Sequence, residues 1–292
     1  MPLFCSNQWS VRLAGRKSNR KQKNSQRHFS FLRCLFYFRL FLPVLFVLLA
    51  ASVSAQEVCL TAQQQLKQIK HWTQVKTIVD GDTLHLKDGR KIRLIGINTP
   101  ELGHRGEASG PFGLQAWQTV RKLLATNKTV GLYYDRERKD RYKRTLAYVV
   151  LPDGTSIEEN LLRQGLALSI VVLPNDRNLA CYRTLETQAR KVGKGLWQLP
   201  EMQWFQAGKL SAKAEGYRFV SGRVLAYNES RKYLYLKLSN NLSVQIARKD
   251  QKKFKHLESL VGKKIRVRGW IHRYKGRQNL RLRVRDNLEL ID

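Results

Sequence analysis

Residues 79–101 read VDGDTLHLKDGRKIRLIGINTPE, and they combine two strand-like patterns with a turn between them. Apolar residues alternate with polar ones at positions 84–87 and again at positions 91–94. The Asp-Gly pair that separates the two runs is a frequent turn sequence. Alternation of period two on both sides of such a turn predicts a β-hairpin.

The predicted hairpin carries polar groups of the kind that phosphodiester chemistry uses. They are Asp82, Arg93, Asn98 and Glu101, which converge at the ends of the hairpin. Hard divalent cations prefer carboxylate, amide and carbonyl oxygens, and a phosphate group fits the fork of a guanidinium. The residues alone leave two interpretations open, a site for metal-assisted phosphodiester cleavage or a turn-rich surface hairpin.

Short motifs along roughly residues 72–199 resemble those of the staphylococcal nuclease family and occur in that family's order. They are DGDT at residues 80–83, TPE at 99–101, DRYKRTLAY at 140–148, LLRQGLA at 161–167 and GLW at 195–197. Several motifs in the right order are more specific than any one of them. The resemblance implies an OB-fold and an enzyme that hydrolyses the phosphodiester bonds of DNA, RNA or both.

By the same resemblance, the metal ligands are Asp82, Asn98 and the main-chain carbonyl of Thr99, and the expected ion is Ca²⁺. Asn98 stands where the family usually has aspartate. An amide oxygen still binds a hard cation, but calcium affinity follows the charge of the ligand set. We therefore expect this site to hold calcium more weakly than the family's usual site.

The resemblance also supplies the other parts that phosphodiester hydrolysis needs, a base for water and positive groups for the phosphoryl oxygens. It implies three catalytic residues: Glu101 helps to activate water, and Arg93 and Arg144 grip the phosphate. Tyr142 is expected to contact the substrate phosphate as well. A binding protein on the same fold is the alternative function, and the presence of all the expected catalytic residues favours the enzyme.

Three positions depart from the family pattern besides Asn98. Ile170 and Val172 stand where the family's namesake has tyrosines that flank the nucleotide, so base stacking is not expected there. Lys143 replaces a glycine in the loop before Arg144.

Residues 1–55 have the organisation of a signal peptide. Residues 1–39 contain nine Lys or Arg and no acid, and an apolar run of about 14 residues follows. This run is shorter than the roughly 20 residues that cross a bilayer, and it ends in small residues at 52–55. We predict cleavage after Ala55 and an exported protein, periplasmic or secreted. An uncleaved membrane anchor is the alternative, and only then is a membrane a partner.

The composition favours a polyanionic partner. The chain has 54 Lys plus Arg against 22 Asp plus Glu, a formal net charge of +32. Basic groups that neutralise phosphates release condensed counterions, so the expected partner is DNA or RNA. A solubilising surface and an adhesin for acidic polymers remain alternatives, and no obligate protein partner is evident.

Two cysteines remain after the predicted cleavage site, Cys59 and Cys181. Export to an oxidising compartment makes one disulfide between them the prediction, with two unrelated thiols as the alternative. No closely spaced cysteine pair of the kind that binds zinc is present in the sequence.

The patterns predict an α+β chain with two barrels. After an N-terminal arm at 56–71, five strands and three helices at 113–124, 156–165 and 180–193 form an OB-fold nuclease domain at 72–199. Residues 200–215 are expected to be a linker. Short alternating segments at 216–292, with one helix near 250–260, predict a second, small OB-like barrel.

The second barrel is predicted to bind nucleic acid. Between Lys263 and Arg285 there are ten Lys or Arg and no acid. The alternation places on one face the expected substrate-binding arginines Arg266, Arg268, Arg281 and Arg283. Trp270 and Tyr274 lie nearby, and a basic face with aromatic rings is how OB-folds hold single strands. The alternative is that Trp270 belongs to the core.

Overall fold

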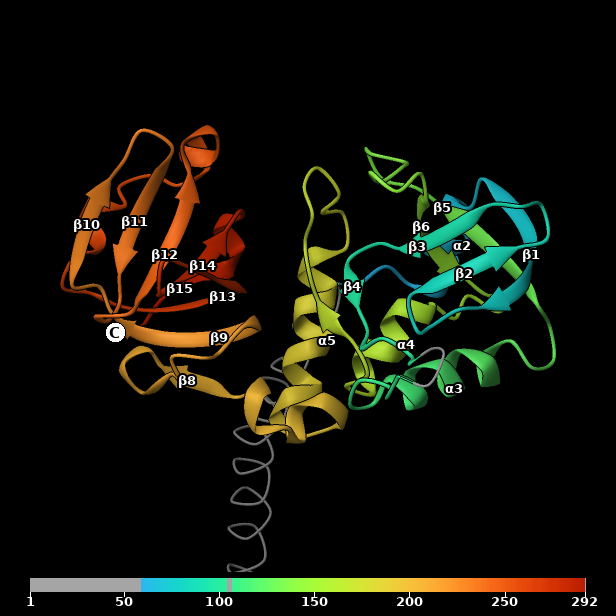
Figure 1. Ribbon diagram of the computed structural model, residues 1–292. Helices are drawn as coiled ribbons and strands as arrows, with labels where there is room; N and C mark the ends of the chain where they lie inside the picture. The colour runs from blue at the N-terminus through green and yellow to red at the C-terminus, as the bar shows by residue number, and fades with distance from the viewer. Residues whose placement is uncertain (1–58, 104–106, 292) are drawn as a thin grey trace, which may run out of the picture. The chain divides into compact units, whose positions relative to one another are not determined.

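The structure is a computed structural model, and it describes residues 59–103 and 107–291 (Figure 1). The predicted signal peptide or membrane anchor, residues 1–55, lies outside these ranges. Within the described ranges, no helix has both the length and the apolar character that crossing a bilayer requires.

Five strands of the first domain close into a barrel (Figure 1). In barrel order they are β1 His71–Ile78, β2 Thr83–Leu86, β3 Lys91–Leu94, β6 Thr145–Val150 and β5 Thr129–Tyr133. β3 and β6 run parallel, whereas the other neighbouring pairs run antiparallel. A five-stranded barrel with helices around it is the predicted OB-type fold class, which is thereby confirmed.

The hairpin predicted within residues 79–101 is formed by β2 and β3. Leu84 lies opposite Ile92 in the antiparallel register, and both side chains are fully buried. Because successive residues of a strand point to opposite faces, Arg93 is directed away from this core. Gly89 in the turn has a φ of +87°, a left-handed conformation that glycine adopts without steric cost.

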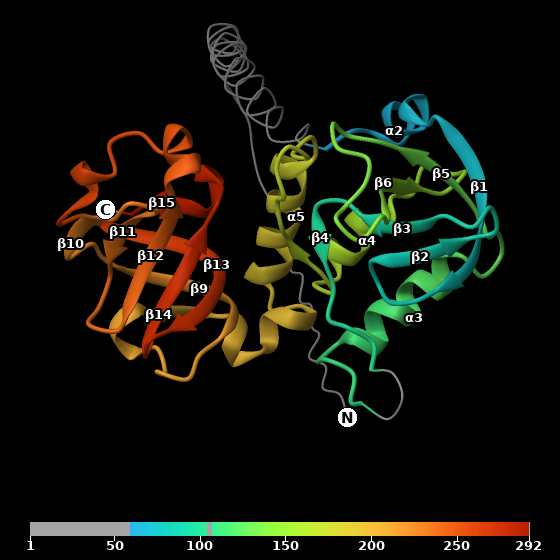
Figure 2. The same cartoon turned by 45° about the horizontal axis from the view of Figure 1, so that its top comes forward.

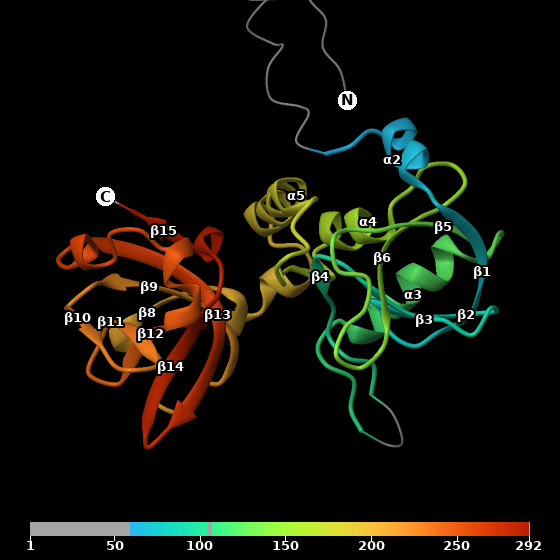
Figure 3. The same cartoon turned by 90° about the horizontal axis from the view of Figure 1, so that it is seen from above.

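The three predicted helices are present as α3 Gly113–Leu123, α4 Ile157–Arg163 and α5 Leu179–Lys191. α4 begins at the predicted cap, because the Ser156 side chain accepts a hydrogen bond from the main-chain N–H of Glu159 at 3.2 Å. Figure 2 shows α3 across one end of the barrel, and α4 and α5 lie side by side in Figures 1 and 3.

The N-terminal arm contains a helix that the sequence analysis does not anticipate. α2 Ala62–Gln68 begins with a capping box in which Thr61 and Gln64 bond each other's main chain. Cys59, ahead of this helix, forms a disulfide with Cys181 of α5, which confirms the predicted pairing. The arm is therefore covalently tied to the last helix of the first domain.

The second domain repeats the strand arrangement of the first. Its sheet runs in the order β10 Ala226–Glu229, β11 Tyr233–Lys237, β12 Leu242–Ala247, β14 Arg277–Leu282, β13 Lys264–Tyr274, β9 Gly216–Arg223 and β8 Trp204–Gln206, and β15 Leu288–Leu290 pairs with β13 (Figure 2). β12 and β14 run parallel, as β3 and β6 do. Only two residues separate β9 from β10. One stretch of chain therefore supplies both the strand that pairs with β13 and the strand that pairs with β11.

Two sequence predictions about this domain are corrected. The segment 200–215 is not only a linker, because β8 lies within it and pairs with β9. The helix predicted near residues 250–260 is instead two short 3₁₀ segments, Arg248–Lys253 and Glu258–Leu260. Between these segments Phe254 is extended and His256 has a left-handed φ of +54°, so a continuous α-helix is interrupted there.

An apolar cluster joins residues of the two domains. Its buried members are Leu168, Ala189, Leu196 and Trp197 of the first and Tyr217 and Phe219 of the second. Arg190 of α5 packs over the rings of Trp197, Trp204 and Phe219, with its Cζ 4.3–5.0 Å from the ring centres. Cation–π contacts and apolar burial therefore both hold the two domains in contact.

Candidate active site

Asp82 lies between β1 and β2, and its carboxylate is almost completely buried. The main-chain N–H of Thr99 donates to Asp82 Oδ2 at 2.8 Å, and the Thr83 hydroxyl donates to Oδ1 at 3.1 Å. Asp80, which the sequence analysis does not single out, accepts a hydrogen bond from the Asp82 N–H at 2.9 Å and so fixes the turn. The Asp82 carboxylate therefore has a fixed orientation.

The surroundings of Asp82 shift its pKa. Burial raises the pKa of Asp82 to about 6, because an apolar environment disfavours the charged form. The guanidinium of Arg93 opposes this shift, and the neighbouring carboxylate of Asp80 adds to it. A buried carboxylate of this kind gains stability from a nearby positive charge, whether a guanidinium or a metal ion.

Arg93 on β3 joins two of the predicted metal ligands. Its Nη1 lies 2.8 Å from Asp82 Oδ2, and its Nη2 donates to Asn98 Oδ1 at 3.0 Å. Nη1 also donates to the carbonyl of Leu94 at 3.2 Å, which holds the guanidinium in place. The side-chain oxygens of Asp82 and Asn98 therefore converge on one positive group.

The oxygens of this cluster fit a hard divalent cation. Asp82 offers a carboxylate, Asn98 an amide oxygen and Thr99 a main-chain carbonyl. Asn98 Nδ2 donates a hydrogen bond to this Thr99 carbonyl at 3.3 Å. The buried Thr99 hydroxyl oxygen has no hydrogen-bond partner within the described residues. Only one of these three ligands is charged, and the affinity for a hard cation follows the charge of its ligands.

No competing metal cluster of His, Cys, Asp and Glu stands out in the described part of the chain. The single group of three whose ligand atoms lie close together there is Cys59, Glu159 and Cys181. Two of these are bonded to each other as a disulfide, so their sulfurs are not thiolate ligands.

Glu101 follows β4 Ile97–Asn98 and is exposed. Its main-chain carbonyl accepts a hydrogen bond from the N–H of Gly110 at 3.0 Å. A Cβ at Gly113 would lie 2.5 Å from the same carbonyl, so the loop closes against Glu101 only with glycine at that position. The base of this loop is thus fixed while the Glu101 carboxylate faces solvent, as a residue that meets water and substrate needs.

Arg144 directly precedes β6, the strand that pairs with the Arg93-bearing strand β3. In the parallel register of β3 and β6, Arg93 is opposite Leu146, and Arg144 is two residues earlier. The two arginines predicted to grip the phosphate therefore come from β3 and from the loop that leads into its neighbour β6.

Asp140 anchors Arg144, and it is a residue that the sequence analysis does not assign to the site. Arg144 Nε donates to Asp140 Oδ2 at 2.7 Å, and the Arg144 N–H donates to Oδ1 at 2.9 Å. Burial alone would raise the pKa of Asp140, but the hydrogen bonds from Arg144 outweigh it and lower the pKa. Lys143 between them has a φ of +63°, the left-handed conformation that a glycine would adopt more readily.

Tyr142 in the same loop is 63% exposed, so its ring is accessible to substrate. The guanidinium of Arg144 lies 5.5 Å from its ring centre, and Arg141 donates to its hydroxyl at 2.6 Å. Val172, which stands in place of a family tyrosine, is 60% exposed and offers no ring for stacking.

The four predicted substrate-binding arginines of the second domain do not share one environment. Arg266, Arg281 and Arg283 are exposed, and Arg266 packs over Trp204 with its Cζ 5.2 Å from the ring centre. Arg268 lies on the predicted face, but it is buried because its guanidinium forms an ion pair with Glu186 of α5. The prediction that Arg268 contacts nucleic acid is therefore corrected.

Comparison with known proteins identifies the family of the first domain. The model of the family described as Staphylococcal nuclease homologue matches residues 91–199. Thermonuclease of Staphylococcus intermedius is 39% identical over 127 residues, which are 42% of this chain and 74% of that protein. Thermonuclease of Staphylococcus hyicus is 37% identical over 123 residues, 41% of this chain and 72% of that protein.

A relative from another genus shows a similar match. Endonuclease YncB of Bacillus subtilis (strain 168) is 33% identical over 124 residues, 41% of this chain and 58% of that protein. The barrel, the order of the motifs and the extent of these matches lead to one conclusion. The chain belongs to the staphylococcal nuclease family.

Proposed function

We propose that this chain is a metal-dependent nuclease that hydrolyses the phosphodiester bonds of DNA, RNA or both. The proposal is based on the contacts of Arg93. Its Nη1 lies 2.8 Å from Asp82 Oδ2, and its Nη2 lies 3.0 Å from Asn98 Oδ1. A set of cation ligands and a phosphate-binding group are thus parts of one hydrogen-bonded cluster, which suits metal-assisted cleavage. The relatives' names, thermonuclease and endonuclease, agree with this chemistry.

Asp82, Asn98 and the Thr99 carbonyl would hold the ion, and calcium is the ion that their oxygens favour. When bound, the ion supplies positive charge beside a phosphoryl oxygen of the substrate. The Asn98 amide leaves the ligand set with one carboxylate, so we expect activity to require a relatively high calcium concentration.

The three predicted catalytic residues, Arg93, Arg144 and Glu101, act directly on substrate and water. Arg93 directs Nη1 and one Nη2 proton at Asp82 and Asn98, which leaves its Nε edge to donate to a phosphoryl oxygen. Arg144 donates from its Nη atoms as negative charge develops in the transition state. Glu101 accepts a proton from the attacking water, a role that its solvent-facing position allows.

The second domain adds a surface for single-stranded nucleic acid, which we call the aromatic-basic face. It consists of Arg266, Trp270, Tyr274, Arg281 and Arg283. Trp270 is 47% exposed and Tyr274 is 65% exposed, so neither ring belongs to the core. Trp270 pairs with Arg281 across β13 and β14, which puts a ring and a guanidinium side by side. Stacking on the rings and ion pairs to phosphates would hold a strand there.

Export is part of the proposal. Disulfides persist in oxidising compartments, so the Cys59–Cys181 bond agrees with the leader predicted at residues 1–55. We therefore propose a periplasmic or secreted enzyme.

The proposal is tested by incubating the purified chain with plasmid DNA, single-stranded DNA and RNA in calcium, in magnesium and in chelator. Gel electrophoresis then reports cleavage and band shifts separately. We expect cleavage in calcium and none in chelator. Retarded but uncleaved nucleic acid under every metal condition would instead establish a binding protein, the alternative that the uncharged Asn98 ligand favours.

A further inference from the structure

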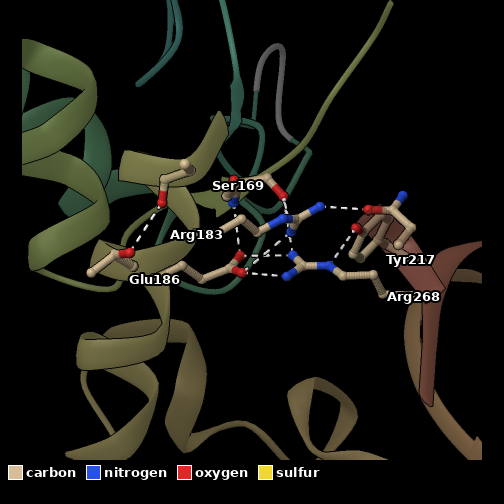
Figure 4. A network of polar contacts seen from close by, with 8 residues as sticks. Ser169, Arg183, Glu186, Tyr217 and Arg268 are labelled. Atoms are coloured by element: carbon tan, nitrogen blue, oxygen red, sulfur yellow. Dashed lines mark hydrogen bonds and ion pairs between the residues drawn. The ribbon is translucent and has the colours of Figure 1, made fainter. Parts of the chain in front are cut away.

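Arg268 of β13 enters a largely buried polar network at the contact between the two domains (Figure 4). Its Nη1 pairs with Glu186 Oε2, and its Nη2 donates to Glu186 Oε1 at 2.8 Å. The Tyr217 hydroxyl accepts from Nε at 2.9 Å, and the Ser169 carbonyl accepts from Nη2 at 3.0 Å. Each nitrogen of the guanidinium therefore has a partner.

The network fixes both main-chain polar groups of Ser169. The Ser169 N–H donates to Glu186 Oε1 at 2.8 Å, and its carbonyl accepts from Arg268 and also from Arg183 Nη1 at 2.8 Å. Ser169 belongs to β7 Leu168–Ser169, a strand of two residues. One edge of β7 is thus held by charged side chains of α5 and β13 rather than by another strand.

The other edge of β7 carries part of the candidate active site. β7 pairs with β4 Ile97–Asn98, with Ile97 opposite Ser169 and Asn98 opposite Leu168. A two-residue strand has few hydrogen bonds of its own, so its position depends on what holds its partner. Asn98 therefore has one support, through β7, in a guanidinium from the second domain, besides its direct contact with Arg93.

We propose that Arg268 is a positioning residue for the metal site: by holding Ser169 it sets the place of the Asn98–Thr99 segment. This inference rests on the proposed nuclease function, and it gives the second domain a part in the chemistry besides binding. Partners that orient metal ligands from outside typically change metal affinity or activity about 10- to 100-fold when they are removed.

A purely structural role for Arg268, docking one domain on the other, is separable by experiment. Docking has a further support in Arg190, which packs over Trp197, Trp204 and Phe219 and donates to the carbonyl of Met202. Arg190 has no contact with Ser169 among the described hydrogen bonds. Arg190→Gln therefore weakens docking without loosening β7.

The test measures calcium affinity by titration calorimetry, and kcat and KM on a dinucleotide, for the full chain. The dinucleotide has one phosphodiester bond and engages the active site alone. We expect Arg268→Gln to weaken calcium binding and to lower kcat, each by about tenfold or more. Both quantities are measured at a temperature well below the variant's melting temperature. Arg268→Lys, which keeps a charge against Glu186, should recover part of both losses.

Two controls match the change. Arg231→Gln removes one exposed arginine of the same domain and should leave calcium affinity and kcat unchanged. Arg190→Gln should lower the melting temperature without this loss of calcium affinity. If Arg268→Gln does not fold, Tyr217→Phe, which removes the hydroxyl that accepts from Arg268 Nε, should shift calcium affinity in the same direction.

The positioning role would be overturned if Arg268→Gln had the same calcium affinity and kcat as the wild type. If Arg268→Gln does not fold, the same result in Tyr217→Phe would overturn it. The same loss of calcium affinity in Arg190→Gln would also overturn it, because docking alone would then explain the effect. Failure of the proposed function appears differently, as a wild-type chain that cleaves no substrate. The positioning role is then judged on calcium affinity alone.

Discussion

Replacement of Arg144 by alanine should lower kcat by about 10²–10⁴-fold. Arg144 Nε is engaged by Asp140 at 2.7 Å, while its Nη atoms make no hydrogen bond to another described residue. Two charge-assisted hydrogen bonds to the phosphoryl oxygens contribute about 1.5–3 kcal/mol each, or roughly 3–6 kcal/mol together. At about 1.4 kcal/mol per tenfold in rate, this gives the stated range.

The structure also predicts how related variants should rank. Arg144→Lys keeps the charge but loses the fork, so it should retain only part of the activity. Asp140→Asn leaves the guanidinium in place and weakens only its anchor, so we expect a loss of about tenfold, smaller than that of Arg144→Ala.

The assay is steady-state hydrolysis of a single-stranded oligonucleotide at saturating concentration, so that kcat is read apart from binding. Thermal unfolding of each variant controls for misfolding. A kcat for Arg144→Ala within tenfold of wild type would refute the assignment of Arg144 to transition-state stabilisation.

Three further predictions concern the metal, the second domain and stability. Asn98→Asp should tighten calcium binding about fivefold or more in titration calorimetry, since an added unit charge at about 4 Å contributes at least ~1 kcal/mol; equal or weaker binding would exclude Asn98 as a ligand. Arg281→Gln with Arg283→Gln should reduce the salt dependence of single-strand affinity, with the slope falling by about 1.4 for two lost phosphate contacts; an unchanged slope would mean that these arginines serve solubility. Burial raises the pKa of Glu158 from 4.5 to about 8, so its stabilising contribution is complete below pH 4.5 and is lost as pH rises through about 8. Urea unfolding should show a steeper decline with pH in the wild type than in Glu158→Gln, where only other groups such as Asp82 contribute, and parallel pH profiles would contradict the prediction.

The hairpin was predictable from sequence because its information is local. Leu84 and Ile92 alternate with polar neighbours on either side of a glycine turn, and period-two alternation specifies which face is buried. The order of motifs then indicated the barrel and the cluster around Asp82. Asp140 was missed, although it lies four residues before Arg144 in the same motif, because its role is to anchor another side chain.

Arg268 was not predictable for the opposite reason. Alternation along β13 correctly puts it on the same face as Arg266, but its partner Glu186 is 82 residues away in sequence. Tertiary contacts decide which residues of a strand face are buried against another domain. No local sequence pattern encodes these contacts. The segment near residues 250–260 shows a smaller limit, since its sequence pattern gives no sign that the helix is interrupted at residues 254–257.

The hydrolysis rate of Glu101→Gln in calcium tests the central claim most directly. Glutamine keeps the size of the side chain but cannot accept the proton from water, and general base catalysis contributes about 10²–10⁴-fold. We predict that the single-turnover rate on bound single-stranded DNA falls by this factor, with affinity for the DNA unchanged. A rate within tenfold of wild type would contradict a hydrolytic site built around Glu101.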